Sequence, residues 1–160
     1  KENNPDKSIT YMKINKFWLD KKLQDLSHDE WEALCDHCGK CCVIKLQNEE
    51  SNELYYTNVS CKLLNTENCS CNDYINRKDI VPDCVKLTPS NLSQLNWMPE
   101  TCAYKLVNEG KDIPEWHPLN QEYEDNTLNA KYSVAQKVIS ENDINMDKIT
   151  DYIYDWDKEV

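Results

Sequence analysis

Nine cysteines are the residues of this 160-residue sequence best suited to do chemistry. Four of them fall in one short run, Cys35-Asp36-His37-Cys38-Gly39-Lys40-Cys41-Cys42, in which two residues twice separate successive thiols. That spacing lets neighbouring thiolates reach one ion from a tight turn, as in zinc and iron–sulfur sites. Secreted disulfide domains usually have an even number of cysteines and a signal peptide, whereas the count here is odd and no signal-peptide pattern precedes the run. Together with the spacing, this favours metal ligation over disulfides.

The other five cysteines stand farther along the chain, at Cys61, Cys69, Cys71, Cys84 and Cys102. Two sites of four thiolates each would use eight of the nine and leave one over. Successive residues of an extended backbone point in different directions, so we expect Cys41 and Cys42 to serve different sites or different roles. His37 lies inside the run, but beside so many thiols we expect it to be a loop residue.

The identity of the metal stays open at this point. Zinc takes four thiolates in a tetrahedron and contributes folding energy directly. An iron–sulfur cluster also takes four cysteines, and the spacing of Cys35, Cys38 and Cys41 is similar to a ferredoxin run. A ferredoxin would continue with three residues, a cysteine and a proline, whereas Cys42 follows Cys41 at once. Zn²⁺ and an Fe–S cluster are therefore both retained as cofactors.

The composition limits which partners and which cellular compartment we expect. The formal net charge is -11 and Arg77 is the only arginine, whereas a nucleic-acid surface needs clustered Lys and Arg. Hydrophobic residues make up 39%, and no apolar run approaches the roughly 20 residues that a bilayer span needs. We expect a protein partner, no nucleic acid and no membrane. Free thiolates point to a reducing compartment, which is the cytoplasm or, if a targeting segment has been removed, an organelle matrix.

Two local features should position the cysteine run. Ser27 and Glu30 form a capping-box pattern, so a helix that begins there should deliver the chain at Cys35. Gly39 is one of only two glycines, and its place inside the run predicts a turn with positive φ.

The remaining elements complete the expected fold. Residues 53–59 read as a short strand and residues 61–83 as a loop pinned by ligands. Thr88-Pro89 predicts a helical segment that runs to residue 95. A second helix should begin at Pro99 and stop at Gly110. We expect a further helix at residues 133–140. We predict a mainly α fold (α with a little β), a small cysteine-rich, metal-stabilised single domain over residues 17–119. A flexible segment, 1–16, would precede it, and a partly helical C-terminal extension, 120–160, would pack on it.

The run at residues 34–42 is similar to the signature of the CxxCxxCC family of zinc- or iron-chelating proteins. Further segments across residues 17–119, such as Cys69-Ser70-Cys71 and Pro114-Glu115-Trp116-His117-Pro118-Leu119, resemble its YcgN-like branch of bacterial proteins. In the wider family the run is followed by a cysteine, by Cys-x-x-Tyr-x-x-Arg and by another cysteine. The matching positions here are Cys61, then Cys71 with Tyr74 and Arg77, then Cys84, and the proline that often follows the arginine is displaced to Pro82.

The resemblance leaves Cys69 without a counterpart in the wider pattern, so we expect it to be the spare thiol. The predicted metal ligands are Cys35, Cys38, Cys41, Cys42, Cys61, Cys71, Cys84 and Cys102. The resemblance also suggests that Tyr74 and Arg77 donate hydrogen bonds to ligand sulfurs, with a packed tyrosine and a plain surface arginine as the equally open alternative.

These observations predict a metal-binding protein that serves as a structural or adaptor module, in which metal fixes a surface for a partner. An iron–sulfur electron-transfer or redox-sensing protein and a metal-delivery factor are the alternatives. No Ser-centred elbow, phosphate loop or pair of carboxylates stands out. We therefore assign no catalytic residue and expect the chain not to be an enzyme in its own right.

Overall fold

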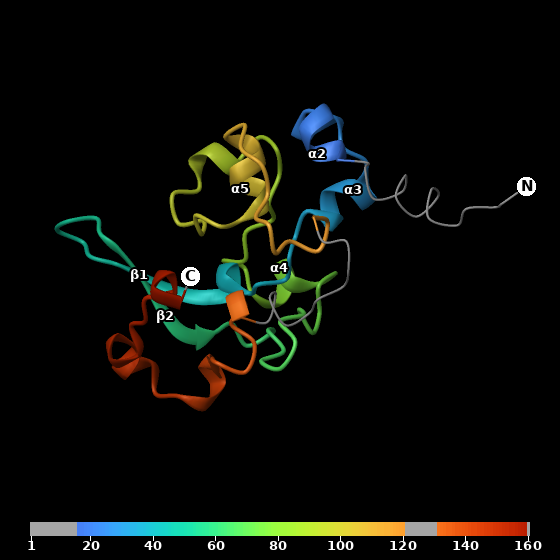
Figure 1. Ribbon diagram of the computed structural model, residues 1–160. Helices are drawn as coiled ribbons and strands as arrows, with labels where there is room; N and C mark the ends of the chain where they lie inside the picture. The colour runs from blue at the N-terminus through green and yellow to red at the C-terminus, as the bar shows by residue number, and fades with distance from the viewer. Residues whose placement is uncertain (1–15, 121–130, 160) are drawn as a thin grey trace, which may run out of the picture.

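The computed structural model describes residues 16–120 and 131–159, so nearly all of the predicted N-terminal segment 1–16 lies outside the described residues. These ranges contain four short α-helices and a small sheet, and Figure 1 shows how they are arranged. The helices are α2 (Phe17–Asp20), α3 (His28–Ala33), α4 (Arg77–Ile80) and α5 (Ala103–Asn108). The strands are β1 (Val43–Gln47), β2 (Leu54–Ser60) and β3 (Ile139–Ser140). Between them lie 3₁₀ segments at Leu23–Asp25, Lys40–Cys42, Leu92–Gln94, Glu141–Asp143, Met146–Tyr152 and Trp156–Glu159.

The prediction of a mainly α fold is wrong. Of the described residues 33% are helical and 13% are in strands, and a three-stranded sheet is present. Neither α3 nor α5, the longest α-helices of the described ranges, exceeds 6 residues. No strand was predicted between the cysteine run and residue 53, but Val43–Gln47 forms β1 once β2 lies beside it.

The sheet has the order β1-β2-β3. β1 and β2 form an antiparallel hairpin in which Val43 lies opposite Ser60, and the predicted strand at 53–59 is confirmed as β2. The register shifts between Val43 and Lys45, directly after the cysteine run, which is where a bulge re-aims side chains. β3 adds to β2 in parallel, with Val59 opposite Ile139.

Two separate hydrophobic clusters form the core. The first is built from α2, α3, α5 and their connections, and the second from the sheet and the C-terminal segments, as the upper and lower parts of Figure 1 show. Buried members of the first cluster are Phe17, Trp18, Leu23, Leu34, Leu92, Met98, Ala103, Tyr104 and Ile113. Buried members of the second are Val43, Leu64, Cys69, Val134 and Trp156. Both are small, as the polar composition leads one to expect.

Some of the predicted helix ends are confirmed and others are wrong. The capping box at Ser27 and Glu30 is present in both directions, and Gly39 and Gly110 have φ of 77° and 75°. The helix predicted from Pro99 begins only at Ala103, and of the segment predicted from Thr88 only the 3₁₀ turn Leu92–Gln94 forms.

The helix predicted at residues 133–140 is also wrong. Gln136 has φ of 63°, which ends any helix there, and Ile139–Ser140 pairs with β2 instead. Farther on, Trp156 donates from Nε1 to the Thr57 carbonyl at 3.0 Å and holds the C-terminal segment on the sheet. None of the helices in the described ranges has the length and apolar character needed to span a bilayer.

Candidate metal centre

The cysteine run leaves α3 at a position that a buried histidine fixes. His117 has no exposed surface, and its Nδ1 accepts a hydrogen bond from the Leu119 N–H at 3.0 Å. The proton of the neutral ring therefore sits on Nε2, which donates to the Leu34 carbonyl at 2.7 Å. This bond ties residues 117–119 to the last residue before Cys35, so His117 positions the run without being a ligand.

The first half of the run is a tight turn held by its own backbone. The His37 N–H points at the Cys35 sulfur at 3.4 Å, and the Cys38 N–H donates to the buried Asp36 carboxylate at 3.1 Å. N–H groups directed at sulfur are the usual support of a thiolate that ligates metal. His37 itself is exposed with φ of 58°, and His28 is exposed in the first turn of α3.

Gly39 brings the second half of the run close to the second core cluster. A Cβ at this position would lie 2.7 Å from Val134 and 2.9 Å from the Cys69 sulfur. Only glycine combines this approach with the left-handed backbone that the turn needs. The Val134 N–H also donates to the Cys38 carbonyl at 2.8 Å, which fixes the turn against the C-terminal part of the chain.

Cys41 and Cys42 lie on a 3₁₀ turn rather than on an extended backbone, which corrects the premise from which their divergence was predicted. Their sulfurs are 3.9 Å apart and share a hydrogen bond. Cys41 is exposed at the surface, whereas Cys42 is half-buried against the second core cluster. All nine cysteines are free thiols.

Cys102 lies against the first core cluster, as Cys35 does. It is the N-cap residue of α5, and both Cys35 and Cys102 pack against that cluster. Tyr104 of α5 holds α3 in place: its hydroxyl donates to the Trp31 carbonyl at 2.7 Å, and the two rings are 4.6 Å apart. The contact between α3 and α5 thus places Cys102 near Cys35 although 67 residues separate them.

Three further cysteines gather on the side of Cys42. The Cys61 N–H donates to the Cys42 carbonyl at 2.8 Å, which continues the β1–β2 pairing into the cysteine run. The chain then folds back so that Leu64 and Cys71 form an antiparallel bridge. Cys84 follows α4, where its N–H donates to the Val81 carbonyl at 2.9 Å.

Cys69 has a different environment from the other thiols. It is buried in the second core cluster, packs against Gly39 and Val134, and directs its thiol at the Cys38 carbonyl at 3.8 Å. Its backbone has φ of 61°, so it turns inward from the loop that carries Cys71. Such a thiol behaves as a small hydrophobic group with a weak donor.

Burial and mutual repulsion keep most of the gathered thiols protonated in the absence of a cation. Burial raises the pKa of Cys35 to about 12 and that of Cys102 to about 11, and the charge of Cys41 adds to both effects. The pKa of Cys38 is also raised, first by burial and then by the charges of Asp36 and Cys41. A bound metal ion would supply the positive charge that these thiolates lack, and its binding would release protons.

Cys41 is the exception, and a lysine contributes to the difference. A hydrogen bond from the Cys42 thiol and, next, the charge of the Lys45 ammonium lower the pKa of Cys41 to about 7, although burial opposes them. Lys45 donates to the carbonyls of Cys41 at 3.1 Å and Val43 at 2.9 Å, and its ammonium lies 4.8 Å from the centre of the Trp97 ring. Sequence reading missed Lys45, because only the β1 register brings it back over the run.

Tyr74 and Arg77, which the resemblance suggested as donors to sulfur, make other contacts. The Arg77 guanidinium stacks 3.8 Å from the centre of the Tyr74 ring, and the Tyr74 hydroxyl reaches the Glu32 carboxylate at 3.2 Å. Tyr74 remains 48% exposed, and the described hydrogen bonds of the pair go to Glu32 and backbone rather than to sulfur. The pair links the loop after Cys71 to α3, which carries Cys35.

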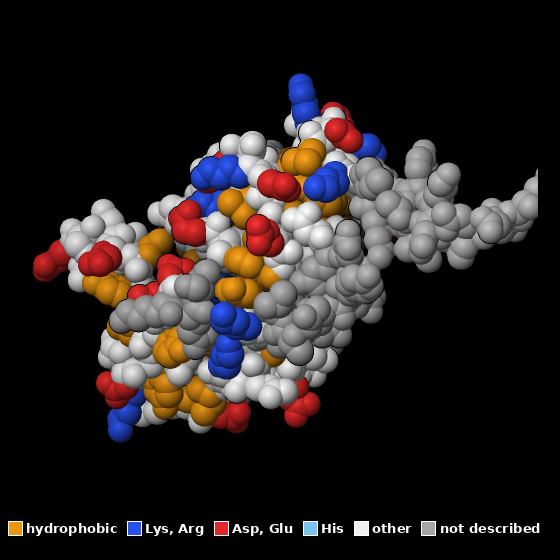
Figure 2. All heavy atoms as spheres, viewed as in Figure 1, with side chains coloured by type: hydrophobic (Ala, Val, Ile, Leu, Met, Phe, Trp, Pro, Cys, Tyr) orange, Lys and Arg blue, Asp and Glu red, His pale blue; other side chains and the backbone are white. Residues whose placement is uncertain are grey.

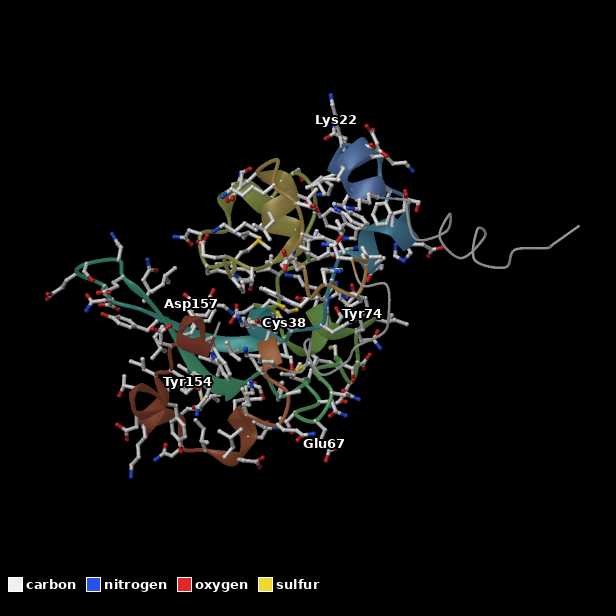
Figure 3. The ribbon with its side chains drawn as sticks, in the orientation of Figure 1. Lys22, Cys38, Glu67, Tyr74, Tyr154 and Asp157 are labelled. Atoms are coloured by element: carbon white, nitrogen blue, oxygen red, sulfur yellow. The ribbon has the colours of Figure 1, made fainter. Side chains whose placement is uncertain are left out.

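The donor set fits zinc or an iron–sulfur cluster in its chemistry. Soft thiolates gather at the middle of the molecule, where Figure 3 labels Cys38, with amide donors on two sulfurs and a cation nearby. Within residues 16–120 and 131–159, no three Cys, His, Asp or Glu side chains stand close enough to hold an ion as they lie. Side-chain rotation would have to bring the thiols into convergence on a metal.

The comparisons agree with this donor set. Residues 34–103 match the CxxCxxCC family, whose description is "putative zinc- or iron-chelating domain". Together with the gathered thiols, this match supports the class: a small metal-binding protein. No solved structure matches the chain.

Relatives from several bacteria extend the match over most of the chain. A UPF0260 protein of Parvibaculum lavamentivorans is 48% identical over 141 residues, which cover 88% of this chain and 92% of the relative. UPF0260 proteins of Rhizobium johnstonii and Pseudomonas savastanoi are 47% and 45% identical, again over 88% of this chain and over 89% and 95% of their own lengths. The chain belongs to the UPF0260 family.

Proposed function

We propose that the protein is a structural or adaptor module whose thiolate-bound metal joins its two halves and so fixes a surface for a protein partner. The observation that carries this proposal is the position of the thiols between the two core clusters. Cys35 and Cys102 pack on the first cluster, whereas Cys42 packs on the second. Metal bound at this junction would crosslink halves that each have a small core of their own.

The sizes of the energies support a structural role. Within residues 16–120 and 131–159, the first core cluster has nine buried members and the second five, which is little apolar burial for so many residues. A structural zinc ion contributes about 10–16 kcal/mol at neutral pH in zinc-finger peptides. One such ion would contribute as much as the whole net stability of about 5–15 kcal/mol that is usual for a domain.

The partner is proposed to be a protein rather than nucleic acid or a membrane, in a reducing compartment such as the cytoplasm. On the face shown in Figure 2, Lys and Arg side chains lie among Asp and Glu rather than in one basic patch. The net charge of -11 repels the phosphate backbone of a nucleic acid. Nine free cysteines stay reduced in a compartment that keeps thiols from forming disulfides.

Metal delivery is the second candidate, and the exposure of Cys41 favours it. A ligand thiol at the surface, with its pKa lowered to about 7, can be reached by the thiol of a client protein, and ligand exchange can begin there. A buried structural site would have no need of such access. An iron–sulfur redox protein would use the same ligands. Its visible absorption would distinguish it from the structural module and from the delivery factor.

The test is to purify the chain without oxygen and to measure its visible spectrum and its metal and sulfide content on one sample. A colourless protein with zinc, which holds that zinc against an excess of a competing thiol peptide, is the result expected of the structural module. Rapid loss of zinc to the peptide would favour delivery instead. Iron, labile sulfide and broad visible absorption would favour redox chemistry, and a sample without metal would contradict the whole proposal.

A further inference from the structure

We infer that the cysteines form two adjacent four-thiolate centres, one from Cys35, Cys38, Cys41 and Cys102 and the other from Cys42, Cys61, Cys71 and Cys84, with Cys69 outside both. The inference rests on the proposed metal-binding function and adds the division of the ligands. It applies to two zinc ions and to two iron–sulfur clusters alike, because both take four cysteines.

The first centre is assembled by α3, α5 and the tight turn between Cys35 and Cys41. Cys35 and Cys102 share the first core cluster, and the Tyr104 hydroxyl bonded to α3 keeps the start of α5 in place. Each of the thiols Cys35, Cys38 and Cys102 feels the charge of Cys41, and Cys35 also feels that of Cys102. The charge of Cys41 also reaches Cys69 and Cys42, so Cys41 is assigned to this centre by its place three residues after Cys38 and by its exposure away from the second core cluster.

The second centre is assembled by the end of β2 and the loop that follows. A backbone hydrogen bond of 2.8 Å joins Cys61 to Cys42, and the bridge between Leu64 and Cys71 folds the loop back toward Cys61. The Leu63 N–H points at the Cys61 sulfur at 3.5 Å, as the His37 N–H does at Cys35 in the first centre. Cys84 completes this centre by elimination, because Cys102 packs on the first core cluster and Cys69 is buried in the second; the charges of Cys84 and Cys71 also reach the Cys61 thiol.

The two centres meet at Cys41 and Cys42. These sulfurs are 3.9 Å apart, yet their other neighbours differ. Cys42 packs on the second core cluster and is bonded to the Cys61 backbone, whereas Cys41 is exposed beside the thiols of the first centre. Adjacent residues thus connect two centres that draw their remaining ligands from different halves of the molecule.

Cys69 is excluded by its packing. Its sulfur lies against Gly39 and Val134 in the second core cluster, and its thiol is directed at the Cys38 carbonyl. To reach a metal it would have to leave a buried position that Val134 and the backbone of the run enclose.

The test counts metal per chain by native mass spectrometry, on wild type loaded with zinc, or with iron and sulfide if the purified protein contains them. Wild type and Cys69→Ser are expected to carry two centres, whereas Cys102→Ser and Cys84→Ser each keep one. In Cys102→Ser, alkylation of the folded protein should modify Cys35 and Cys38 and spare Cys61. In Cys84→Ser the pattern should reverse.

A second measurement needs no substituted ligand. Wild type is treated with rising chelator, and the alkylated cysteines are identified at each step; protection should be lost in two sets of four. A wild-type chain with one centre, a single ligand variant that loses all metal, or protection that crosses the two sets would overturn the division and leave the metal-binding function standing. Wild type that holds no metal would refute the proposed function itself.

Discussion

Gly39 is the residue on which the geometry of the cysteine run depends most. Its φ is 77°, and a Cβ there would meet Val134 at 2.7 Å and Cys69 at 2.9 Å. Gly110 has nearly the same φ, of 75°, with nothing within 4 Å of the added atom. Substituting each glycine by alanine therefore distinguishes the free-energy cost of backbone strain, present at both positions, from the cost of overpacking, present only at Gly39.

We expect Gly39→Ala to lower the free energy of unfolding by about 2–4 kcal/mol, since left-handed strain and overpacking add. Gly110→Ala should lower it by only about 1 kcal/mol, because strain acts alone. Urea titration of both metal-loaded variants provides the comparison. Equal losses would mean that Val134 and Cys69 give way and that space at Gly39 is unimportant.

Lys45 supplies the positive charge closest to the exposed thiol. Its ammonium is bonded to the Cys41 carbonyl and lowers the pKa of the Cys41 thiol. We expect Lys45→Met to weaken metal affinity roughly tenfold, the usual effect of removing a group just behind the ligands. Competition with a chromophoric chelator measures this, with exposed Lys22→Met as the control. Affinity unchanged in Lys45→Met would show that the lysine only packs.

The contact between α3 and α5 decides whether Cys35 and Cys102 are neighbours. Tyr104→Phe removes the hydroxyl that donates to the Trp31 carbonyl and keeps the ring. We expect a loss of about 1 kcal/mol in unfolding free energy. Tyr55→Phe removes a hydroxyl bonded to Glu53 at the surface, where the change should stay within about 0.5 kcal/mol. If both variants unfold at the same denaturant concentration, the α3–α5 bond contributes nothing.

His117 links the start of the cysteine run to residues 117–119 and should give the fold a dependence on pH. Burial lowers its pKa below the usual 6.5, although the Leu34 hydrogen bond and the charge of Asp36 oppose this. The unfolded chain then binds more protons as the pH falls through about 6.5, so stability is lost on acidification below that value.

We expect the unfolding free energy to fall more steeply between pH 7 and pH 5 in wild type than in His117→Gln, each measured with metal content checked at every pH. Exposed His28→Gln should follow wild type. Because thiolate protonation also releases metal, only the difference between variants is assigned to His117. Parallel curves for wild type and His117→Gln would contradict the role of its neutral, buried ring.

The capping box, the turn at Gly39, the strand at 53–59 and the stop at Gly110 were predictable, because each depends on a few adjacent residues. β1 and β3 were not, since Val43–Gln47 and Ile139–Ser140 become strands only by pairing with β2. The same limit applies to the site. The spacing within residues 35–42 indicated metal, whereas Lys45 over the run and His117 behind it depend on contacts between distant segments.

The molecule as a whole is two small cores with thiols at their junction. Trp31 and Tyr104 are in contact on one side, and Trp156 is buried on the other, so aromatic groups report on the packing of both halves. Without metal the buried thiols stay protonated, and no crosslink through them joins the two halves. The account therefore predicts that the fold depends on the metal.

The most direct measurement is the near-ultraviolet circular dichroism of the chain during removal of metal by a chelator, under anaerobic and reducing conditions. The account predicts that the aromatic signal collapses as metal is lost, that thermal unfolding moves to lower temperature, and that both recover when the metal is returned. A metal-free chain that keeps its aromatic signal and its unfolding temperature would contradict the claim that metal joins the two halves.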